Sequence, residues 1–261
     1  MKIALIEFHI EWEDKEKNFA KAEKCLNLLK DKGVQLVLFP EMSFTGFSMQ
    51  VEKTADAEEE TIRRASGWSK EYGMTIGCGW VGQAGQRCGN HYSVADQGRM
   101  IADYVKIHPF SYSGEDRYFE KGDHLCVCGV EDFCLGLQIC YDLRFPEVFQ
   151  ILSKKADIIA VPANWPQKRR EHWNCLLRAR AIENQVYIAG INCVGAIGGL
   201  EYSGDTQLID PAGNVCRPAE EISSEADKIY IYEIQNNVSE IRKGFPVKQD
   251  RREELYRNLS V

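Results

Sequence analysis

Short apolar segments of strand length alternate with longer segments of helical periodicity along most of this chain. Residues 2–8 form the first apolar run, and apolar side chains then recur over residues 15–30 as on one face of a helix. The next run, Val34–Phe39, has almost no polar position, which indicates a strand covered on both faces. A repeated strand–helix–strand order of this kind predicts an α/β layered sandwich.

The same patterns place the other elements. Besides Lys15–Lys30, helices are predicted at Glu58–Tyr72, Pro146–Lys154 and Lys168–Asn184. Further strands are predicted at Met74–Val81, His91–Ala95, Met100–Lys106, Phe133–Ile139, Asp157–Pro162, Val186–Asn192, Thr206–Ile209 and Lys228–Ile234. The charged tail from Val238 is expected to pack on the outside of the fold or on a partner.

The composition narrows the class of protein. Of 261 residues, 44% are apolar and 27% charged, as in soluble globular domains, which excludes a disordered, collagen-like or coiled-coil chain. Neither an internal repeat nor a linker rich in proline, glycine or serine divides the sequence. A single domain over residues 1–261 is therefore expected.

The charge balance bears on partners and location. The net charge is −7 at pH 7, whereas nucleic-acid binders usually carry a basic footprint, so no nucleic acid is expected as a partner. Glu7 interrupts the first apolar run, and no run approaches the roughly 18–20 apolar residues that cross a bilayer. These features predict a cytoplasmic protein with no membrane partner.

Ten cysteines require an explanation. They include no Cys-x-x-Cys pair, and no His, Cys and Asp cluster has metal-ligand spacing, so neither a metal nor another cofactor is expected. Cysteines among apolar neighbours behave as small hydrophobic residues. That role is predicted for Cys25, Cys78, Cys134, Cys175 and Cys193.

Three predicted strands end in a reactive or charged side chain. Glu41 follows the strand that Pro40 ends, Lys106 lies in an otherwise apolar stretch, and Cys140 follows residues 133–139. In α/β sheets the carboxyl ends of strands are where ligands bind. Taken singly, each has a simpler interpretation: a loop cap for Glu41, a solvated lysine for Lys106 and another buried thiol for Cys140.

The surroundings of Cys140 favour a chemical role. The strand runs into Cys140, then into a short turn and a helix start, as in a nucleophile elbow. The polar neighbours Tyr141, Asp142 and Arg144 argue against a merely buried thiol. His108 precedes a proline and is interpreted as a hydrogen-bonded structural imidazole rather than a base.

Together the three side chains fit one chemistry. A thiol must lose its proton before it attacks, and Glu41 could accept that proton. Lys106 could stabilise the thiolate and then the oxyanion of a tetrahedral intermediate, and we expect the backbone N–H of Tyr141 to share that role. The pattern predicts a metal-free Glu–Lys–Cys hydrolase.

At this point the sequence resembles a known family. Residues 39–41, 104–108 and 139–146 look like the three catalytic blocks of the nitrilase superfamily of carbon–nitrogen hydrolases. Residues 162–166 and 178–185 resemble further blocks of that family, and the similarity extends over nearly the whole chain. The resemblance implies a four-layer α-β-β-α sandwich that pairs through its helical layers into homodimers or larger homo-oligomers.

The resemblance also implies roles for individual residues. It assigns Glu41 as the base, Lys106 as the oxyanion support and Cys140 as the nucleophile. It adds a second glutamate between the lysine and the cysteine, a place that Glu115 occupies, where it would orient Lys106 and the water. Spacing alone does not identify Glu115.

Within the family, the segment 106–115 looks most like that of ω-amidases. These cleave a small linear ω-amide of the 2-oxoglutaramate or 2-oxosuccinamate type to acid and ammonia through a cysteine thioester.

The blocks do not separate this activity well from N-carbamoyl amidase, aliphatic amidase or nitrilase activity. A Cys–His amidase using His108 or His172 leaves Glu41 and Lys106 without roles. A catalytically silent binding scaffold would be favoured if one of the three reactive residues were replaced.

A carboxylate-bearing amide requires a cation other than Lys106 in the pocket. Arg144 and Arg117 are candidates, since arginine binds carboxylate through paired hydrogen bonds. The sequence slightly favours a different role for Arg144, an internal ion pair with Asp142 or Glu147 that only shapes the elbow.

Overall fold

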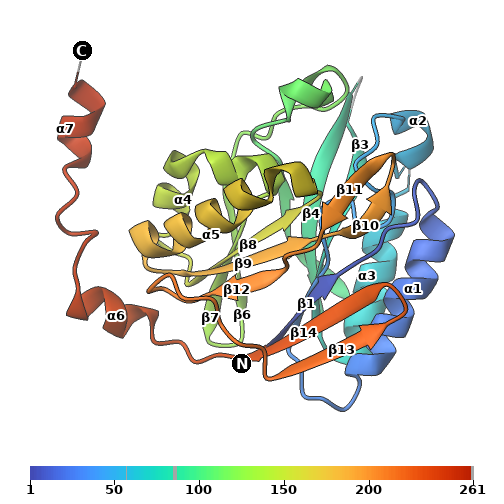
Figure 1. The fold of residues 1–261 in the computed structure, drawn as a ribbon, viewed down its shortest axis with the longest axis horizontal. Coiled ribbons are helices and arrows are strands. Elements are labelled where there is room, and N and C mark those ends of the chain that lie inside the picture. The colour runs from blue at the N-terminus through green and yellow to red at the C-terminus, as the bar shows by residue number, and fades with distance from the viewer. Residues whose placement is uncertain (57, 85–86, 260–261) are drawn as a thin grey trace.

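The computed structural model describes residues 1–56, 58–84 and 87–259. Two β-sheets lie face to face, and helices cover the outer face of each sheet (Figure 1). The four-layer α-β-β-α sandwich that the resemblance implied is therefore confirmed.

The first sheet has the strand order β13-β14-β1-β2-β3-β4-β5. Its strands are β1 (Lys2–Glu7), β2 (Leu36–Leu38), β3 (Thr75–Ala84), β4 (Arg87–Asp96), β5 (Arg99–Val105), β13 (Glu220–Ser224) and β14 (Asp227–Glu233). The helices α1 (Lys15–Leu29) and α3 (Glu60–Tyr72) cover its outer face, and α2 (Val51–Thr54) is a short turn before α3.

The second sheet has the order β12-β9-β8-β7-β6. Its strands are β6 (Cys126–Val130), β7 (Phe133–Leu137), β8 (Ile158–Ala163), β9 (Tyr187–Asn192) and β12 (Gln207–Ile209). The helices α4 (Pro146–Leu152) and α5 (Arg170–Asn184) cover its outer face. Pro146 opens α4, the position in a helix where a missing N–H costs no hydrogen bond.

The apolar residues divide into layers that match this architecture. Leu5, Leu36 and Leu135 belong to the core between the two sheets. Trp68 lies in the core between the first sheet and its helices, and Trp173 in the core of the second sheet. Since β2, β8 and β9 are buried on both faces, their sequences are nearly continuous apolar runs.

The predicted strands and helices are present, with shifted ends. The run Val34–Phe39 forms a strand only over its centre, β2, and the second predicted helix begins two residues late, at Glu60. The hairpin of β10 (Val194–Ile197) and β11 (Leu200–Ser203) was not predicted, because glycines interrupt its alternation. Gly198, in the hairpin turn, has φ +55°, and a Cβ there would lie 2.5 Å from the Trp12 ring.

The predicted outward packing of the tail is confirmed for its first part. Helix α6 (Val238–Gly244) is fastened by Arg242, whose Nη2 donates to the carbonyl oxygens of Ser153 and Ala156, each at 3.1 Å. Figure 1 shows α7 (Glu253–Asn258) away from the sandwich. A 2.7 Å ion pair between Lys154 and Glu253 links it to the end of α4.

The cysteine predictions are partly wrong. Cys25, Cys78 and Cys193 are buried as predicted, but Cys134 is only half-buried and Cys175 is exposed. Cys175 is two residues from both Trp173 and Leu177, so it lies on the opposite face of α5 from these core residues. All ten cysteines are free thiols.

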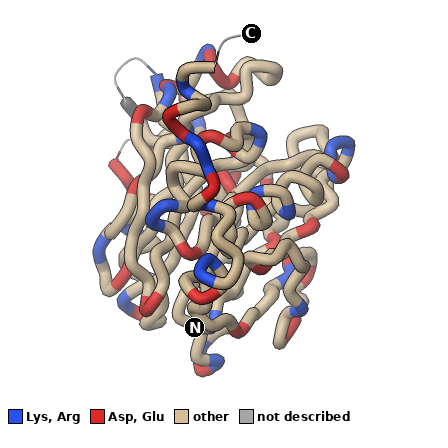
Figure 2. The backbone as a smooth tube through the Cα atoms, turned by 90° about the vertical axis from the view of Figure 1, so that its left-hand side faces the viewer, with Lys and Arg blue, Asp and Glu red and all other residues tan. Residues whose placement is uncertain are grey.

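Charged residues of both signs are spread over the molecule. Figure 2 shows basic positions interspersed with acidic ones along the chain. Within the described ranges, no helix has both the length and the apolar character needed to traverse a bilayer.

Candidate active site

Glu41, Lys106 and Cys140 converge at one end of the sandwich. Glu41 lies three residues beyond β2, Lys106 directly follows β5, and Cys140 opens a 3₁₀ turn after β7, so both sheets contribute. Glu41 and Lys106 are 1% and 0% exposed, and Glu115, at the start of a second 3₁₀ turn, is 0% exposed. The structure thus brings together all four side chains singled out from the sequence.

Lys106 binds both glutamates. Its Nζ lies 2.8 Å from Glu41 Oε1 and 2.9 Å from Glu115 Oε2. Burial opposes the charge of Lys106, but Glu115 and then Glu41 outweigh it and raise the pKa of the ammonium above its usual value. Lys106 is therefore a fixed positive charge at neutral pH.

Two asparagines hold Glu41 in place. Asn90 Nδ2 donates to Glu41 Oε1 at 2.9 Å, and the backbone N–H of Asn164 donates to Oε2 at 2.9 Å. Asn164 Nδ2 also donates to the Glu41 carbonyl oxygen at 2.6 Å. Gly79 of β3 permits this arrangement, because a Cβ there would lie only 2.3 Å from the backbone nitrogen of Met42.

Sequence reasoning missed both asparagines as site residues. Asn164 left a usable signal, because it directly follows the apolar strand β8, much as Glu41 follows β2. Asn90 left none, because its burial, at 1% exposed, is a property of the tertiary structure.

Glu115 completes the cluster as the second carboxylate on Lys106. Its Oε1 accepts from Asn90 Nδ2 at 2.8 Å, so Asn90 bridges the two glutamates. Its Oε2 accepts from the backbone N–H of Phe110 at 2.5 Å. Burial raises the pKa of the Glu115 carboxyl, and the Lys106 charge opposes that rise.

Cys140 occupies a strained backbone position. Its φ is +43°, a region that residues with a side chain rarely adopt, and such strain often marks functional sites. Cys140 begins the 3₁₀ turn Cys140–Arg144. The first N–H groups of a helical turn have no acceptor within the turn, and Tyr141 is its second residue. The predicted nucleophile-elbow geometry is therefore present.

Asp142 anchors this turn. Its Oδ2 accepts from the Ile139 N–H at 2.9 Å and from the Tyr104 hydroxyl at 2.8 Å. Its Oδ1 lies 2.7 Å from His108 Nδ1 and also accepts from the His108 backbone N–H. The His108 ring stacks on Phe145 with centroids 3.8 Å apart. His108 is thus a hydrogen-bonded structural imidazole, as predicted.

The surroundings of Cys140 favour the protonated thiol in the free protein. Burial raises the pKa of Cys140 well above its usual value, and the Glu41 charge raises it further, while Lys106 lowers it. A neighbouring base must therefore take the proton as the thiol attacks, and Glu41, bound to the Lys106 that lines the cavity with Cys140, is the candidate.

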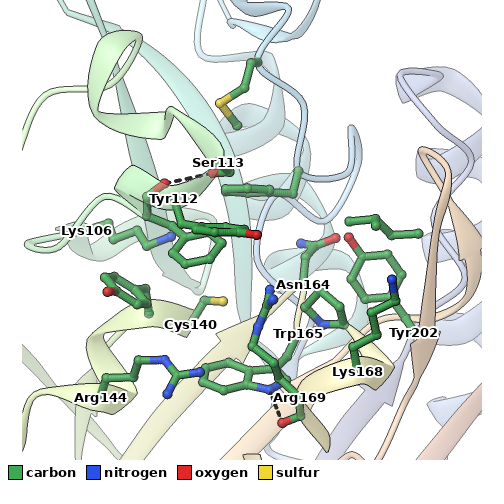
Figure 3. A pocket seen from close by; sticks show the side chains of 16 residues that line it. Lys106, Tyr112, Ser113, Cys140, Arg144, Asn164, Trp165, Lys168, Arg169 and Tyr202 are labelled. Carbon is green, nitrogen blue, oxygen red and sulfur yellow. Dashed lines mark hydrogen bonds between the residues drawn. The ribbon is translucent and has the colours of Figure 1, made fainter.

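The cluster opens into a cavity of about 380 Å³. Cys140 and Lys106 lie on its wall with aromatic residues such as Phe110, Tyr141 and Trp165 (Figure 3). Its other charged side chains are Arg144, Lys168 and Arg169, and within the described part of the chain the lining includes no aspartate or glutamate.

The sequence expectation for Arg144 is wrong. Asp142 is already engaged by Tyr104 and His108, and Arg144 instead faces the cavity. Its Cζ lies 4.9 Å from the centroid of the Trp165 ring, and its Nη2 lies 3.2 Å from His172 Nδ1. The other candidate, Arg117, is exposed and outside the cavity lining.

The Cys–His alternative finds little support in this geometry. Neither His108 nor His172 lines the cavity, so neither is placed as a base for Cys140. Across the residues the structure describes, no group of three or more His, Cys, Asp or Glu side chains is arranged to hold a metal ion.

Comparison with known proteins gives a consistent result. Residues 2–243 match the sequence model of the carbon–nitrogen hydrolase family. The 2-oxoglutaramate amidase of Bacillus subtilis (strain 168) is 32% identical over 262 aligned positions, which cover 97% of this chain and 98% of that protein. The omega-amidase YafV of Escherichia coli (strain K12) is 29% identical over 251 positions and 96% of each chain.

A solved structure adds a chemical observation. An amidase variant from Nesterenkonia sp. AN1, in which acrylamide has added to the active-site cysteine, is 25% identical to this chain. The two structures superpose with a TM-score of 0.85 over 99% of each chain. The similarity to amidases therefore extends over the fold as well as the sequence.

Proposed function

The chain belongs to the carbon–nitrogen hydrolase family and hydrolyses amides, and from this premise we propose that it is an ω-amidase. Its substrate is a small linear amide with a free carboxylate at the other end, of the 2-oxoglutaramate or 2-oxosuccinamate type. One observation carries the proposal: Cys140, beside the Glu41–Lys106–Glu115 cluster, faces a cavity whose remaining charged side chains are cations. The names of the Bacillus and Escherichia relatives support the same substrate class.

The first half of the reaction forms a thioester. Glu41 takes the thiol proton as Cys140 Sγ attacks the amide carbon, and the C=O bond becomes a single bond to an oxyanion. Lys106 Nζ and the Tyr141 N–H stabilise that oxyanion. When the intermediate collapses, the C–N bond breaks and Glu41 returns the proton to the departing nitrogen, which leaves as ammonia.

The second half uses water in place of the thiol. Glu41 accepts a proton from water as its oxygen attacks the thioester carbon, and Lys106 again faces the oxyanion. The C–S bond then breaks, the thiolate takes the proton back, and the acid is released. Glu115 positions Lys106 in both halves, since it binds the same Nζ as Glu41 does.

Arg144 is the proposed anchor for the substrate carboxylate. Its guanidinium lies against Trp165 in the cavity wall, and no carboxylate of the described chain forms an ion pair with it. Its position four residues after Cys140 places a cation on the same turn as the nucleophile. A planar guanidinium binds carboxylate through two parallel hydrogen bonds.

A substrate panel tests this proposal. The kcat/KM for 2-oxoglutaramate and succinamate is compared with that for their neutral esters and for propionamide. The acids are expected to be preferred by well over tenfold, or about 1.4 kcal/mol of transition-state binding. Equal rates on acid and ester, or faster turnover of a nitrile or N-carbamoyl compound, would overturn the substrate assignment and leave the family assignment intact.

We also propose that the chain acts in the cytoplasm as one domain that forms a homodimer or larger homo-oligomer. Exposed apolar side chains on two surfaces support association. Ile151 and Ile182 are exposed on the α4–α5 layer, and Phe245 and Leu259 are exposed on the tail. Ten free thiols suit a reducing compartment. Light scattering coupled to gel filtration tests the assembly, and a monomer mass at micromolar concentration would contradict it.

A further inference from the structure

The cavity holds more positive charge than a single carboxylate requires. Besides Arg144, the basic side chains of Lys168 and Arg169 line it, and no acid in the described ranges pairs with either of them. The next residue differs, because Arg170 Nη2 lies 2.6 Å from Asp205 Oδ1 and is not part of the lining. Among the described residues, the cavity cations other than Lys106, namely Arg144, Lys168 and Arg169, thus have no acidic partner, whereas Lys106 is paired with Glu41 and Glu115.

Of the two further cations, Arg169 is the one held in place. It ends the short 3₁₀ turn Gln167–Arg169, and its carbonyl oxygen accepts from Trp165 Nε1 at 2.8 Å. Its Cζ lies 5.3 Å from the centroid of the Phe110 ring, and the side chain extends into the cavity (Figure 3). Lys168, by contrast, is exposed.

Arg144 and Arg169 flank the same group of aromatic rings. Arg144 lies over Trp165, whose indole N–H binds the Arg169 carbonyl. Arg169 lies over Phe110, whose ring centroid is 4.8 Å from that of Tyr141. The Arg169 charge also reaches Tyr202 on the cavity wall: burial raises the pKa of that phenol, and Arg169 opposes the rise. Two guanidinium groups therefore act on one small volume.

Building on the ω-amidase proposal, we infer that Arg169 is the residue that discriminates by the substituent next to the substrate carboxylate. With the carboxylate on Arg144, a 2-oxo oxygen can accept a hydrogen bond from Arg169. An α-ammonium group in that place meets a positive charge with no acid nearby to offset it. The cavity thus accepts 2-oxo acid ω-amides and rejects zwitterionic amino acid amides such as glutamine.

The test uses three substrates that differ only at C2. These are 2-oxoglutaramate, glutaric acid monoamide and glutamine, with kcat and KM measured for each. In Arg169→Gln the ratio of kcat/KM between 2-oxoglutaramate and glutamine is expected to fall at least about tenfold. The loss on 2-oxoglutaramate should appear mainly in KM, because the chemical groups around Cys140 are untouched.

Two variants control for charge and fold. Arg169→Lys keeps a positive charge and a hydrogen-bond donor, so it should lower the ratio less than Arg169→Gln does. Lys168→Gln removes one positive charge from the lining of the same cavity, so it measures the effect of net charge alone. It should change the ratio far less than Arg169→Gln. A ratio unchanged in Arg169→Gln, or lowered equally in Lys168→Gln, overturns the assignment.

A second measurement does not depend on turnover. Iodoacetate and iodoacetamide alkylate the same Cys140 but differ in charge, so their rate ratio reports the cations that face the thiol. Arg169→Gln should lower this ratio several-fold relative to wild type, and an unchanged ratio counts against the inference. Failure of the ω-amidase proposal is recognised separately, since wild-type protein would then hydrolyse neutral esters as fast as acids.

Discussion

Lys106 Nζ lies 2.8 Å from Glu41 Oε1 in the interior of the protein, where each side chain is at most 1% exposed. A buried charge is tolerated only when it is paired and hydrogen-bonded, and here Glu115 supplies a second carboxylate to the same ammonium. The three charges therefore depend on one another, and changing one exposes the roles of the others.

Replacing Lys106 should affect both rate and stability. Lys106→Ala removes an oxyanion donor, for which a loss on the order of 10²–10³ in kcat is usual. It also leaves two carboxylates buried without their cation, which costs about 3–5 kcal/mol in the free energy of unfolding. Steady-state kinetics and urea unfolding measure the two effects.

Lys106→Arg should also fail, because a planar fork cannot replace a compact ammonium between Glu41 and Glu115. A near-normal rate in this variant would show that Lys106 is not the oxyanion support.

Glu41→Gln should separate the base from its electrostatic effect. Turnover should fall about 10²–10⁴-fold, since general-base catalysis is lost. The pH midpoint for alkylation of Cys140 by iodoacetamide should move down, because the negative charge that helps raise the pKa of the thiol is gone while Lys106 remains.

Mass mapping follows the alkylation of Cys140 and of the exposed Cys175 in the same sample, so Cys175 serves as the internal reference. An upward shift of the Cys140 midpoint, or retained turnover, contradicts Glu41 as the base.

Cys140→Ala should abolish turnover and leave the fold intact, because covalent catalysis has no substitute nucleophile here. Wild-type protein quenched during turnover should carry an acyl group on the peptide that contains Cys140, as intact-protein and peptide mass spectrometry would show. Appreciable ammonia release by Cys140→Ala would exclude the thioester mechanism.

Gly79→Ala should displace Glu41 without touching a charged group. The new Cβ would lie 2.3 Å from Met42 N, so the loop that carries Glu41 must move, at a cost of about 1–3 kcal/mol in stability and a loss of kcat. Gly67→Ala in α3 is the matched control, since nothing lies within 4 Å of its Cβ and alanine favours helix. Equal behaviour of the two variants would mean that the close approach at Gly79 is not needed.

Activity should survive dialysis against EDTA, because the proposed chemistry uses only the thiol, carboxylates and ammonium of the chain. Ammonia release before and after chelation measures this directly. Loss of activity with rescue by zinc would refute the Glu–Lys–Cys assignment.

The sequence by itself determined the layering of the fold and the residues around which the site is built. Apolar periodicity reports burial, so the runs at β2, β8 and β9 could be identified as strands, and the run at β2 as a strand covered on both faces. A charged or nucleophilic residue that directly follows such a run stands out locally, which is why Glu41, Lys106 and Cys140 could be identified.

Only the tertiary structure decided which partners these residues have. Asn90 and Asn164 bind Glu41 across 49 and 123 residues of sequence, and Asp142 binds Tyr104 rather than Arg144. Such pairings depend on how strands align within a sheet and how the two sheets pack, and no local pattern records that alignment. The same packing turned Arg144 toward the cavity, where its lack of an acidic partner carries the substrate proposal.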